Sequence, residues 1–461
     1  MRMRWLVGVV LAGCGGGGGD GTGAAETTAV DGTSGGATAP TSGSNSGTSA
    51  PTSEAGASEA TSEVGTTSAV ETTHAASTGE ATTADESSGG ATSGGCAAGQ
   101  EPCPSGCCAA VEVGRLIAGE FHSCVVTGDG GVACWGRGGI IGQDADSNVA
   151  VAVPGLADVT AIAGKDDHSC ALLESGGVMC WGGNFYGSLG DGMPGIDTVT
   201  EPVVAIGLED AVAIWAGAGT SCARRAGGEI WCWGRNDEGQ LGTGNEEDSA
   251  VPIAATALAG VDTVAPAGVH ACGLAGGGVL CWGDNSFGQL GNGKTTDSVP
   301  PVMVMGLEQA GAFIVETNGA HSCVVAGDGA PLCWGNNDGG QFGTGETSNI
   351  EVLPQATQGL AEPVVALSAG FMHTCAVVAS GAVWCWGEGG VGQLGDGATM
   401  DRYLPVAVAG LPGPASAVAC GAGHTCARVG EAVHCWGDNT WGQLGDGSND
   451  PSPTPVVVSG V

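Results

Sequence analysis

Positive charge is scarce in this sequence, and lysine is nearly absent. The 461 residues include two lysines, and 48 acidic side chains stand against 11 lysines and arginines, which gives a formal charge of −37 at pH 7. Proteins that bind nucleic acids need basic side chains to neutralise the phosphates. We therefore exclude nucleic acid as a partner. No helical periodicity follows any of the glycine-rich segments, which argues against a nucleotide site.

Long apolar runs are also missing, and the one that opens the chain, MRMRWLVGVVLAGC, is far too short to span a bilayer. Two arginines precede it, and it ends in small residues before Cys14. That order is typical of an export signal, and LAGC resembles the lipobox of bacterial lipoproteins, which implies lipid attachment at Cys14. We expect residues 1–13 to be a lipoprotein signal peptide. The alternative is an ordinary secretory signal peptide.

Residues 15–95 contain no lysine, arginine or aromatic residue but ten acidic ones. Such a composition cannot bury enough apolar surface to offset the entropy of ordering, so residues 14–95 are predicted to be a disordered linker. A cysteine-rich segment follows over 96–110, with Cys96, Cys103, Cys107 and Cys108. It holds either a zinc site or two disulfides of open connectivity. The absence of paired C-x2-C halves and the predicted export favour the disulfides.

The rest of the chain repeats itself at intervals of 46 to 52 residues. Each repeat contains Cys-Trp-Gly, preceded nine or ten residues earlier by another cysteine. A stretch such as HSCVVTGDGGVACWG (residues 122–136) predicts two strands around a Gly-Asp-Gly turn. The seven cysteine pairs are Cys124 and Cys134, Cys170 and Cys180, Cys222 and Cys232, Cys272 and Cys281, Cys323 and Cys333, Cys375 and Cys385, and Cys426 and Cys435.

The repeats share the pattern P-V-x-V-x-G-L…A-G-x-x-H-[ST]-C…C-W-G-x-N-x-x-G-Q-L-G-x-G. This pattern resembles that of the regulator of chromosome condensation repeat family, whose members fold as seven-bladed β-propellers. The resemblance covers 111–461 and implies an all-β propeller preceded by the linker. Copy 1 departs most, because Gly142-Gln143 is followed by Asp144-Ala145-Asp146, and copy 3 has Thr220 in place of histidine. The chain ends with half of an apolar unit and the repeats begin with the other half, so we expect both termini to share one blade and close the ring.

The paired cysteines face each other across antiparallel strands, close enough for a disulfide after local twisting. Seven reduced thiol pairs are the alternative, but the predicted export favours seven disulfides within the blades. Cys420 lies outside this register and is expected to be a free, buried thiol.

Other recurring residues are interpreted as structural. The glycines of six G-x-[LF]-G-x-G motifs suit tight turns with positive φ. One tryptophan per copy fills the space between blades. One histidine per copy is dispersed around a ring, so we expect partly buried side chains bonded to backbone rather than metal ligands. The histidines are His122, His168, His270, His321, His373 and His424. No nucleophile, base and acid are grouped, so the chain is predicted not to be an enzyme and to need no cofactor or metal.

Recognition is expected in the segments that vary among copies, because repeat scaffolds place binding residues in such loops. Tyr186, Phe287 and Trp441 stand just before the glycine motifs, and Arg402 and Tyr403 follow one of them. Aromatic and arginine side chains dominate protein-binding hot spots. An alternative is that these rings only cover the adjacent turns.

We therefore predict a monomeric, non-enzymatic binding module for a protein or glycan, displayed on the cell surface as an outer-membrane lipoprotein and held to the membrane by its lipid alone. Alternatives implied by the family are an inhibitor of a hydrolase, like bacterial β-lactamase inhibitors with this repeat, a guanine-nucleotide exchange factor or a polysaccharide-acting enzyme. The exchange factors are nuclear, which conflicts with export.

Overall fold

The computed structural model of the protein describes residues 100–103, 106–109, 115–195 and 198–461, the first two segments by their backbone. The predicted signal peptide with Cys14, the linker, and the side chains of Cys96, Cys103, Cys107 and Cys108 lie outside the described part. Strands β1 (Gln100–Cys103) and β2 (Gly106–Ala109) form a two-stranded antiparallel sheet. No helix among the described residues has the length and apolar character needed to cross a membrane.

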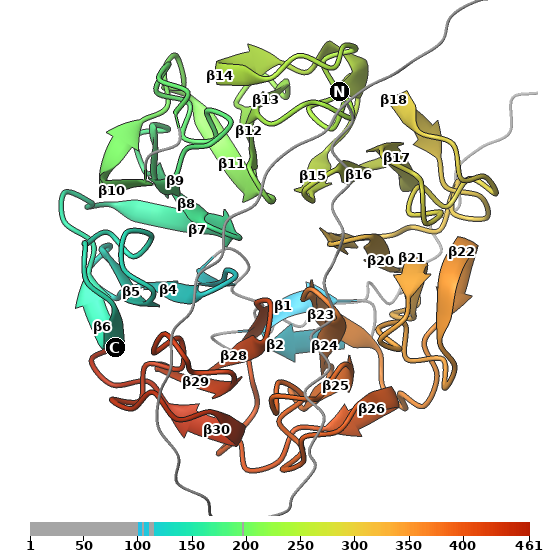
Figure 1. Ribbon diagram of the computed structural model, residues 1–461. Helices are drawn as coiled ribbons and strands as arrows, with labels where there is room; N and C mark the ends of the chain where they lie inside the picture. The colour runs from blue at the N-terminus through green and yellow to red at the C-terminus, as the bar shows by residue number, and fades with distance from the viewer. Residues whose placement is uncertain (1–99, 104–105, 110–114, 196–197) are drawn as a thin grey trace, which may run out of the picture. The chain divides into compact units, whose positions relative to one another are not determined.

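Residues 115–461 form seven four-stranded antiparallel sheets, arranged as the blades of a propeller (Figure 1). This confirms the predicted all-β fold and the number of blades. The first strand of each blade lines a central cavity, and the fourth strand lies outermost. The second and third strands are almost wholly buried because neighbouring blades cover both of their faces, whereas the fourth strands are partly exposed.

The strands of the first four blades run in chain order. Their bounds are β3 (Leu116–Ala118), β4 (His122–Val126), β5 (Val132–Gly136) and β6 (Ser147–Ala152); β7 (Val159–Lys165), β8 (His168–Leu173), β9 (Val178–Gly183) and β10 (Thr198–Val204); β11 (Ala211–Ala216), β12 (Thr220–Arg225), β13 (Ile230–Gly234) and β14 (Ser249–Ala254); and, after the short 3-10 helix η1 (Thr256–Leu258), β15 (Thr263–Pro266), β16 (His270–Ala275), β17 (Gly278–Gly283) and β18 (Ser298–Met303).

The last three blades follow in the same way. Their bounds are β19 (Ile314–Asn318), β20 (His321–Val325), β21 (Pro331–Asn337) and β22 (Ser348–Ala356); β23 (Val364–Ala369), β24 (His373–Val378), β25 (Val383–Gly387) and β26 (Arg402–Ala407); and β27 (Ala417–Cys420), β28 (His424–Val429), β29 (Ala432–Gly437) and β30 (Ser452–Val457).

The predicted sharing of one blade by the two ends of the chain is wrong. Every blade consists of four strands that are consecutive in the sequence, so β3 to β6 form blade 1 and β27 to β30 form blade 7. The apolar segment repeated in each copy, such as residues 151–164, is not a unit of one blade. It ends the fourth strand of one blade and supplies the first strand of the next. The half of this apolar segment at the start of the repeats and the half at the end of the chain therefore belong to two complete, neighbouring blades.

The ring closes through the same kind of contact that joins the other blades. The indole N–H of Trp135 in blade 1 donates to the backbone carbonyl of Gln443 in blade 7 (2.8 Å). The N–H of Ala150 donates to the carbonyl of Ser459 (2.9 Å). Trp135 and Leu444 also share one buried apolar cluster. Closure thus depends on packing between blades rather than on a shared sheet.

All seven disulfides predicted within the blades are present. The two cysteines of each pair lie directly opposite in the second and third strands, as Cys124 and Cys134 do, with Cα atoms 4.0 to 4.1 Å apart. Cys420 is free and buried, as predicted. Each disulfide closes a local hairpin and so fixes the middle of its blade.

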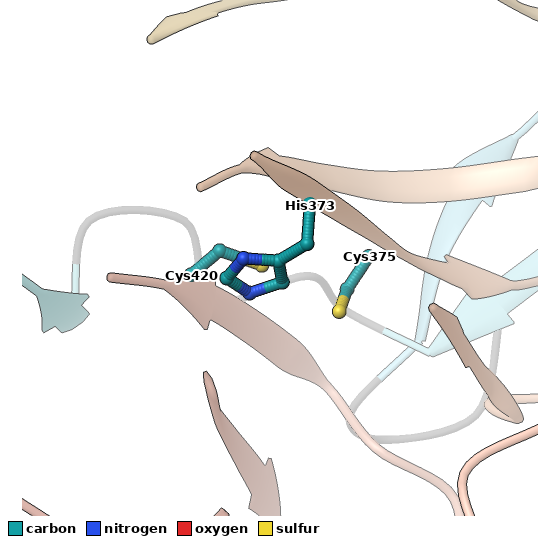
Figure 2. Close-up of side chains that lie close together, drawn as sticks. All are labelled: His373, Cys375 and Cys420. Carbon is teal, nitrogen blue, oxygen red and sulfur yellow. The ribbon is translucent and has the colours of Figure 1, made fainter. Parts of the chain in front are cut away.

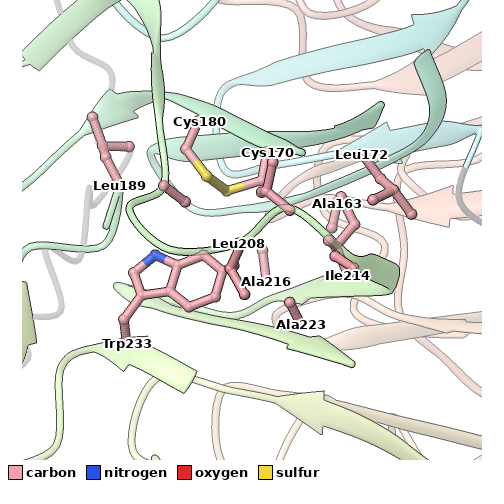
Figure 3. Close-up of a cluster of buried hydrophobic side chains, with 13 residues drawn as sticks. Ala163, Cys170, Leu172, Cys180, Leu189, Leu208, Ile214, Ala216, Ala223 and Trp233 are labelled. Carbon is pink, nitrogen blue, oxygen red and sulfur yellow. A yellow bond between two sulfur atoms is a disulfide. The ribbon is translucent and has the colours of Figure 1, made fainter. Parts of the chain in front are cut away.

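Each junction between blades has the same apolar composition. The junction of blades 2 and 3 contains the Cys170–Cys180 disulfide, Leu189 from the glycine motif of blade 2 and Trp233 from blade 3 (Figure 3). The other six junction clusters repeat this combination, with Phe342 or isoleucine in place of leucine in two of them. All seven tryptophans of the repeats are fully buried, which confirms that they fill the space between blades.

The glycine motifs form the tight turns that the sequence predicts. Gly288, Gly291 and Gly293 have φ values of 83°, 60° and 76°, a region that favours glycine. A Cβ atom at Gly291 would lie 2.9 Å from Nε1 of Trp334 in the next blade. Glycine is therefore required there both for the turn and for the close approach of the indole.

A hydrogen-bond network joins the blades, and blades 4 and 5 illustrate it. The carbonyl of Gln289 accepts the indole N–H of Trp334 (2.8 Å) and the hydroxyl of Ser322 (2.9 Å). Nε2 of His270 lies 2.9 Å from the same hydroxyl oxygen. Because the hydroxyl hydrogen goes to the carbonyl, the histidine must be the donor.

The prediction for the histidines is therefore wrong about their burial and, in five of the six, about the partner of Nε2. The six histidines at this position are fully buried rather than partly buried. Where a partner is resolved for Nε2, it is a hydroxyl of the next blade rather than the backbone, because the ring lies inside the junction. The remaining pairs are His122 with Ser169, His168 with Ser221, His373 with Thr425 and His424 with Ser123.

The two departures from the repeat pattern have structural consequences. Copy 1 lacks the glycine motif that would offer a carbonyl to blade 2, and the indole N–H of Trp181 has no partner among the described residues. Ile140 and Ile141 fill the junction instead. In copy 3 the hydroxyl of Thr220 donates to the carbonyl of Arg235 within the same blade (3.3 Å).

Acid is expected to weaken these junctions. Burial lowers the histidine pKa from 6.5 to about 3 for His122, His321 and His373 and to about 4 for His168, His270 and His424. Between these values the unfolded chain binds protons that the folded chain does not, so stability present above pH 6.5 is lost as the pH falls towards 4. Urea unfolding measured from pH 7.5 to 4.5 reports the net uptake of protons on unfolding, to which each of these histidines contributes.

His373→Gln provides the matched variant, because its carboxamide can donate to Thr425 but does not titrate. We expect it to reduce the proton uptake by about one. An unchanged pH slope in this variant would contradict the assignment. Six carboxyls with raised pKa values act in the opposite direction, so the difference between this variant and the native chain, rather than the total slope, measures the histidine. They are Glu120, Asp166, Asp167, Glu238, Glu316 and Glu388.

Candidate functional site

One face of the ring carries the turns between the first and second strands and the loops between the third and fourth strands. We call it the loop face. In each blade the loop begins against the turn: the N–H of Arg137 donates to the carbonyl of Phe121 (3.0 Å), and that of Glu388 to the carbonyl of Met372 (2.8 Å). The variable residues of turn and loop therefore meet at the same edge of every blade.

The five predicted partner-binding residues lie in these loops or directly after them, but on four different blades. Tyr186 belongs to blade 2, Phe287 to blade 4 and Trp441 to blade 7, whereas Arg402 and Tyr403 open β26 in blade 6. Tyr186, Phe287 and Tyr403 are 40%, 38% and 42% exposed. The structure thus distributes the five residues around the ring and does not gather them into one patch.

Arg402 and Tyr403 are engaged with neighbouring residues. Nε and a terminal nitrogen of Arg402 each lie 2.8 Å from Oδ2 of Asp396, so the guanidinium is bound within its own blade. The ring of Tyr403 covers Gly340 of blade 5, where an added Cβ would lie 2.4 Å from Cδ1. The ring therefore contacts a turn of the neighbouring blade and is also partly exposed to solvent.

A cluster that the sequence analysis missed lies on the loop face where blades 7, 1 and 2 meet. We call it the junction cluster. It consists of Glu120, Phe121, Arg137, Asp166, Asp167 and Trp441. Trp441 is its one predicted member. The two variable residues directly before the repeated histidine could have indicated this cluster. They are Glu120-Phe121 in copy 1 and Asp166-Asp167 in copy 2.

Two aromatic rings and an arginine form the centre of the junction cluster. The rings of Phe121 and Trp441 lie 6.2 Å apart at an angle of 59°. Cζ of Arg137 lies 5.6 Å from the first ring centre and 5.5 Å from the second, within the range of cation–π attraction. The guanidinium also lies 3.9 Å from Oδ1 of Asp167, and its side chain is 44% exposed. This is a rigid, partly exposed surface of the kind found at interface hot spots.

The carboxylates of the junction cluster repel one another. Burial raises the pKa of Glu120 to about 7, with further increases from Asp166 and Asp167, while Arg137 lowers it. Burial and Asp167 raise the pKa of Asp166 to about 6. A positively charged group brought to this surface would relieve the repulsion, so the cluster is suited to a partner with basic side chains.

A similar arrangement on blades 2 and 3 involves the predicted residue Tyr186. Cζ of Arg235 lies 5.4 Å from the centre of its ring. The guanidinium of Arg235 is held by both carboxylate oxygens of Asp237, at 2.7 and 2.8 Å. Bidentate binding fixes the orientation of the guanidinium plane over the Tyr186 ring.

One group of side chains in the described part of the chain has the composition of a metal site. His373, Cys375 and Cys420 bring their ligand atoms within 4.8 Å of one another (Figure 2). However, Cys375 is bonded to Cys385, and the imidazole of His373 is hydrogen-bonded to Thr425. Burial raises the pKa of Cys420 to about 12, which keeps its thiol protonated. In this state the group packs the junction of blades 6 and 7.

Comparison with known families identifies the repeats. A family model described as "Regulator of chromosome condensation (RCC1) repeat" matches residues 227–273, 276–326, 328–377, 380–428 and 431–461. A second model with the same description matches 159–188, 211–240 and 364–393. Together they cover more than half of the chain.

The chain spans only part of the length of the curated relatives that it matches. The chain is 30% identical over 342 residues to the human E3 ubiquitin-protein ligase HERC2. The aligned region covers 71% of this chain but 7% of that protein. It is 30% identical over 237 residues to the ultraviolet-B receptor UVR8 of Arabidopsis thaliana, covering 50% of this chain and 52% of the receptor.

Solved structures share the fold. Prp20p from Saccharomyces cerevisiae aligns with a TM-score of 0.63 and 21% identity over 76% of this chain and 87% of its own. Human WBSCR16 aligns with a TM-score of 0.60 and 23% identity over 68% of this chain and 86% of its own. At these identities the likeness concerns the architecture.

Replacing Asp166 by asparagine should lower the pKa of Glu120 from about 7 towards 4.5, because the charge of Asp166 contributes to the increase. Asparagine tolerates the positive φ of 48° at this position. Arg137→Gln should have the opposite effect, since Arg137 lowers the same pKa. NMR titration of the Glu120 carboxyl measures both shifts. If neither variant changes the titration, burial alone sets this pKa and the carboxylates are not coupled.

Proposed function

This chain belongs to the regulator of chromosome condensation repeat family, and we propose that its propeller is a non-enzymatic module that binds a protein partner through the loop face. The junction cluster is the observation that carries the proposal. Two rings and a guanidinium, fixed by mutual contacts, lie among three carboxylates at one place on this face. Rigid aromatic and arginine side chains bind at low entropic cost, which is why they dominate interfaces.

The charge of the chain supports a basic partner. A formal charge of −37 attracts cationic surfaces over long range and repels nucleic acid. The repulsion among Glu120, Asp166 and Asp167 favours lysine or arginine side chains at the point of contact. Tyr186, Phe287 and Tyr403 extend the binding surface around the ring, and their exposed parts supply apolar contact area.

The use of histidine supports a role without catalysis. General bases in enzymes titrate near neutral pH and reach the substrate. The six repeated histidines are buried in the junctions, and their pKa values are lowered to about 3 or 4. Four of them act as neutral hydrogen-bond donors to a hydroxyl of the next blade: His168, His270, His373 and His424.

We place the module on the cell surface, tethered by a lipid on Cys14. The sequence LAGC, the export signal before it and seven disulfides, which persist in oxidising compartments, support this location. Labelled palmitate supplied to the producing cells should be incorporated into the chain and lost in Cys14→Ser. Labelling that persists in this variant, or its absence from the native chain, would argue against the anchor.

The loop face is tested by changing Phe287, Tyr403 and Trp441 to alanine together. We expect capture of the partner from intact cells to be lost and the melting temperature to change by only a few degrees, because these side chains are partly exposed. Secreted hydrolases are included among the candidate partners, which also tests the inhibitor alternative. The variant is compared with the native chain by affinity capture and by thermal unfolding.

Phe313→Ala is the matched control. Its ring is 44% exposed next to the first residue of β19, at the opposite end of that strand from the turn on the loop face. It should therefore retain the partner. A triple variant that binds with native affinity would place the binding surface elsewhere, and one that unfolds would show that the rings belong to the core.

A further inference from the structure

The central cavity of the ring has the volume and lining of a small-molecule site. The first strands of all seven blades enclose about 480 Å³, a size typical of ligand pockets. Most of the lining is apolar, with contributions from Leu116, Ile117, Ile214 and Phe313. Where the first strands begin, Val212 and Phe313 are 57% and 44% exposed. The cavity therefore has an apolar side chain surface at the end away from the loop face.

One level of this cavity differs sharply among the blades. It is formed by the residue that pairs with the first cysteine of each blade. In blade 5 this residue is Glu316, opposite Cys323, and in blade 3 it is Trp215, opposite Cys222. The other blades place Ile117, Ala163, Ala265, Ser368 and Ala419 there. The three alanines have small side chains, so at this level of the cavity they leave room beside the carboxylate of Glu316 and the indole of Trp215.

Lys165 closes the cavity towards the loop face. It occupies the turn position opposite His168, where the other blades have glycine or alanine except for Asn318 in blade 5. Lys165 and Ala118 also line a second cavity of about 170 Å³, so both residues lie where the two spaces adjoin. The side chain reaches from blade 2 to blade 5, where Nζ donates to the carbonyl of Thr317.

Lys165 does not saturate the carboxylate of Glu316. Nζ lies 3.8 Å from Oε2, which is close enough for an ion pair but too long for a direct hydrogen bond. The carboxylate accepts a hydrogen bond from the backbone of Ala369. An ammonium that approaches from the apolar end of the cavity can make the short hydrogen bond that Lys165 does not make.

The charges around the two cavities favour a cationic ligand. Glu120, Asp166 and Glu316 contribute three carboxylates to the linings, and Lys165 contributes the one ammonium. Burial raises the pKa of Glu316 and Lys165 lowers it, so a second cation would stabilise the ionised carboxylate further. Lys165 also lowers the pKa of Asp166. If a ligand displaces the Lys165 ammonium from Glu316, the Asp166 carboxylate remains as a partner for that ammonium.

We propose that the central cavity binds a small organic ammonium with an apolar chain, whose ammonium pairs with Glu316 and whose chain packs along the first strands. Trp215, at the same level, offers the aromatic surface that organic cations favour. Lys165 acts as an internal competitor for the same carboxylate. This site is separate from the loop face, so it does not depend on the proposed partner binding.

Three probes with the same chain length test the proposal: n-octylammonium, octanoate and octanol, each below its micellar concentration. Isothermal titration of the full chain should show saturable binding of one octylammonium, weaker binding of octanol and the weakest binding of octanoate. A preference for octanoate would mean that the site is built around Lys165 and would overturn the proposal. Failure of all three probes to bind would overturn it as well.

Variants of the ion pair separate a ligand site from a purely structural bridge. Glu316→Gln should weaken octylammonium binding about tenfold or more, because a hydrogen bond to a charged group is lost. Lys165→Met should strengthen it, because the competitor is removed. If the bridge were only structural, Lys165→Met would leave octylammonium binding unchanged or weaken it, which contradicts the proposal.

The double variant, Lys165→Met with Glu316→Gln, provides the control for folding. It carries no unpaired charge in the cavity, and circular dichroism should show native secondary structure and melting. In this variant octylammonium should bind no better than octanol. A remaining preference for the ammonium would show that Glu316 is not its partner.

Discussion

One carbonyl oxygen at six of the seven junctions determines how the ring is held together. The backbone carbonyls of Ser188, Gln240, Gln289, Gln341, Gln393 and Gln443 each accept the indole N–H of the next blade. Presenting this carbonyl requires a tight glycine turn, and reaching it requires a tryptophan at a fixed place on the third strand. The repetition of the segment C-W-G-x-N-x-x-G-Q-L-G-x-G follows from this requirement, because copies 3 to 7 each supply an acceptor to one neighbour and a donor to the other.

Local features of the fold could be predicted from the sequence because they depend on residues close together in the chain. The paired cysteines are nine or ten residues apart, so strand alternation places them face to face without knowledge of the ring. Ring closure and the histidine partners could not be obtained in this way. His270 reaches Ser322, 52 residues further on, and whether a repeat ends within a blade or between blades is decided only by packing.

The candidate sites also depend on contacts between residues far apart in the sequence, which the sequence alone does not reveal. Variable loop residues indicated Trp441, but Phe121 lies 320 residues earlier in the chain and meets it only because the ring closes. Lys165 and Glu316 each look like isolated departures in their own repeats, 151 residues apart. Neither is informative until the structure shows that they meet across the central cavity. In a repeat protein, unusual residues from separate copies gain meaning when they converge.

The absence of a shared blade has a mechanical consequence. A force that pulls the two ends of the propeller apart acts first on the junction of blades 7 and 1, where no sheet ladder crosses and the load falls on packing and single hydrogen bonds. Once a junction yields, each blade keeps a hairpin that cannot extend, because its disulfide joins the second and third strands. The ring would therefore open in blade-sized steps, and the chain would remain shorter than its number of residues allows.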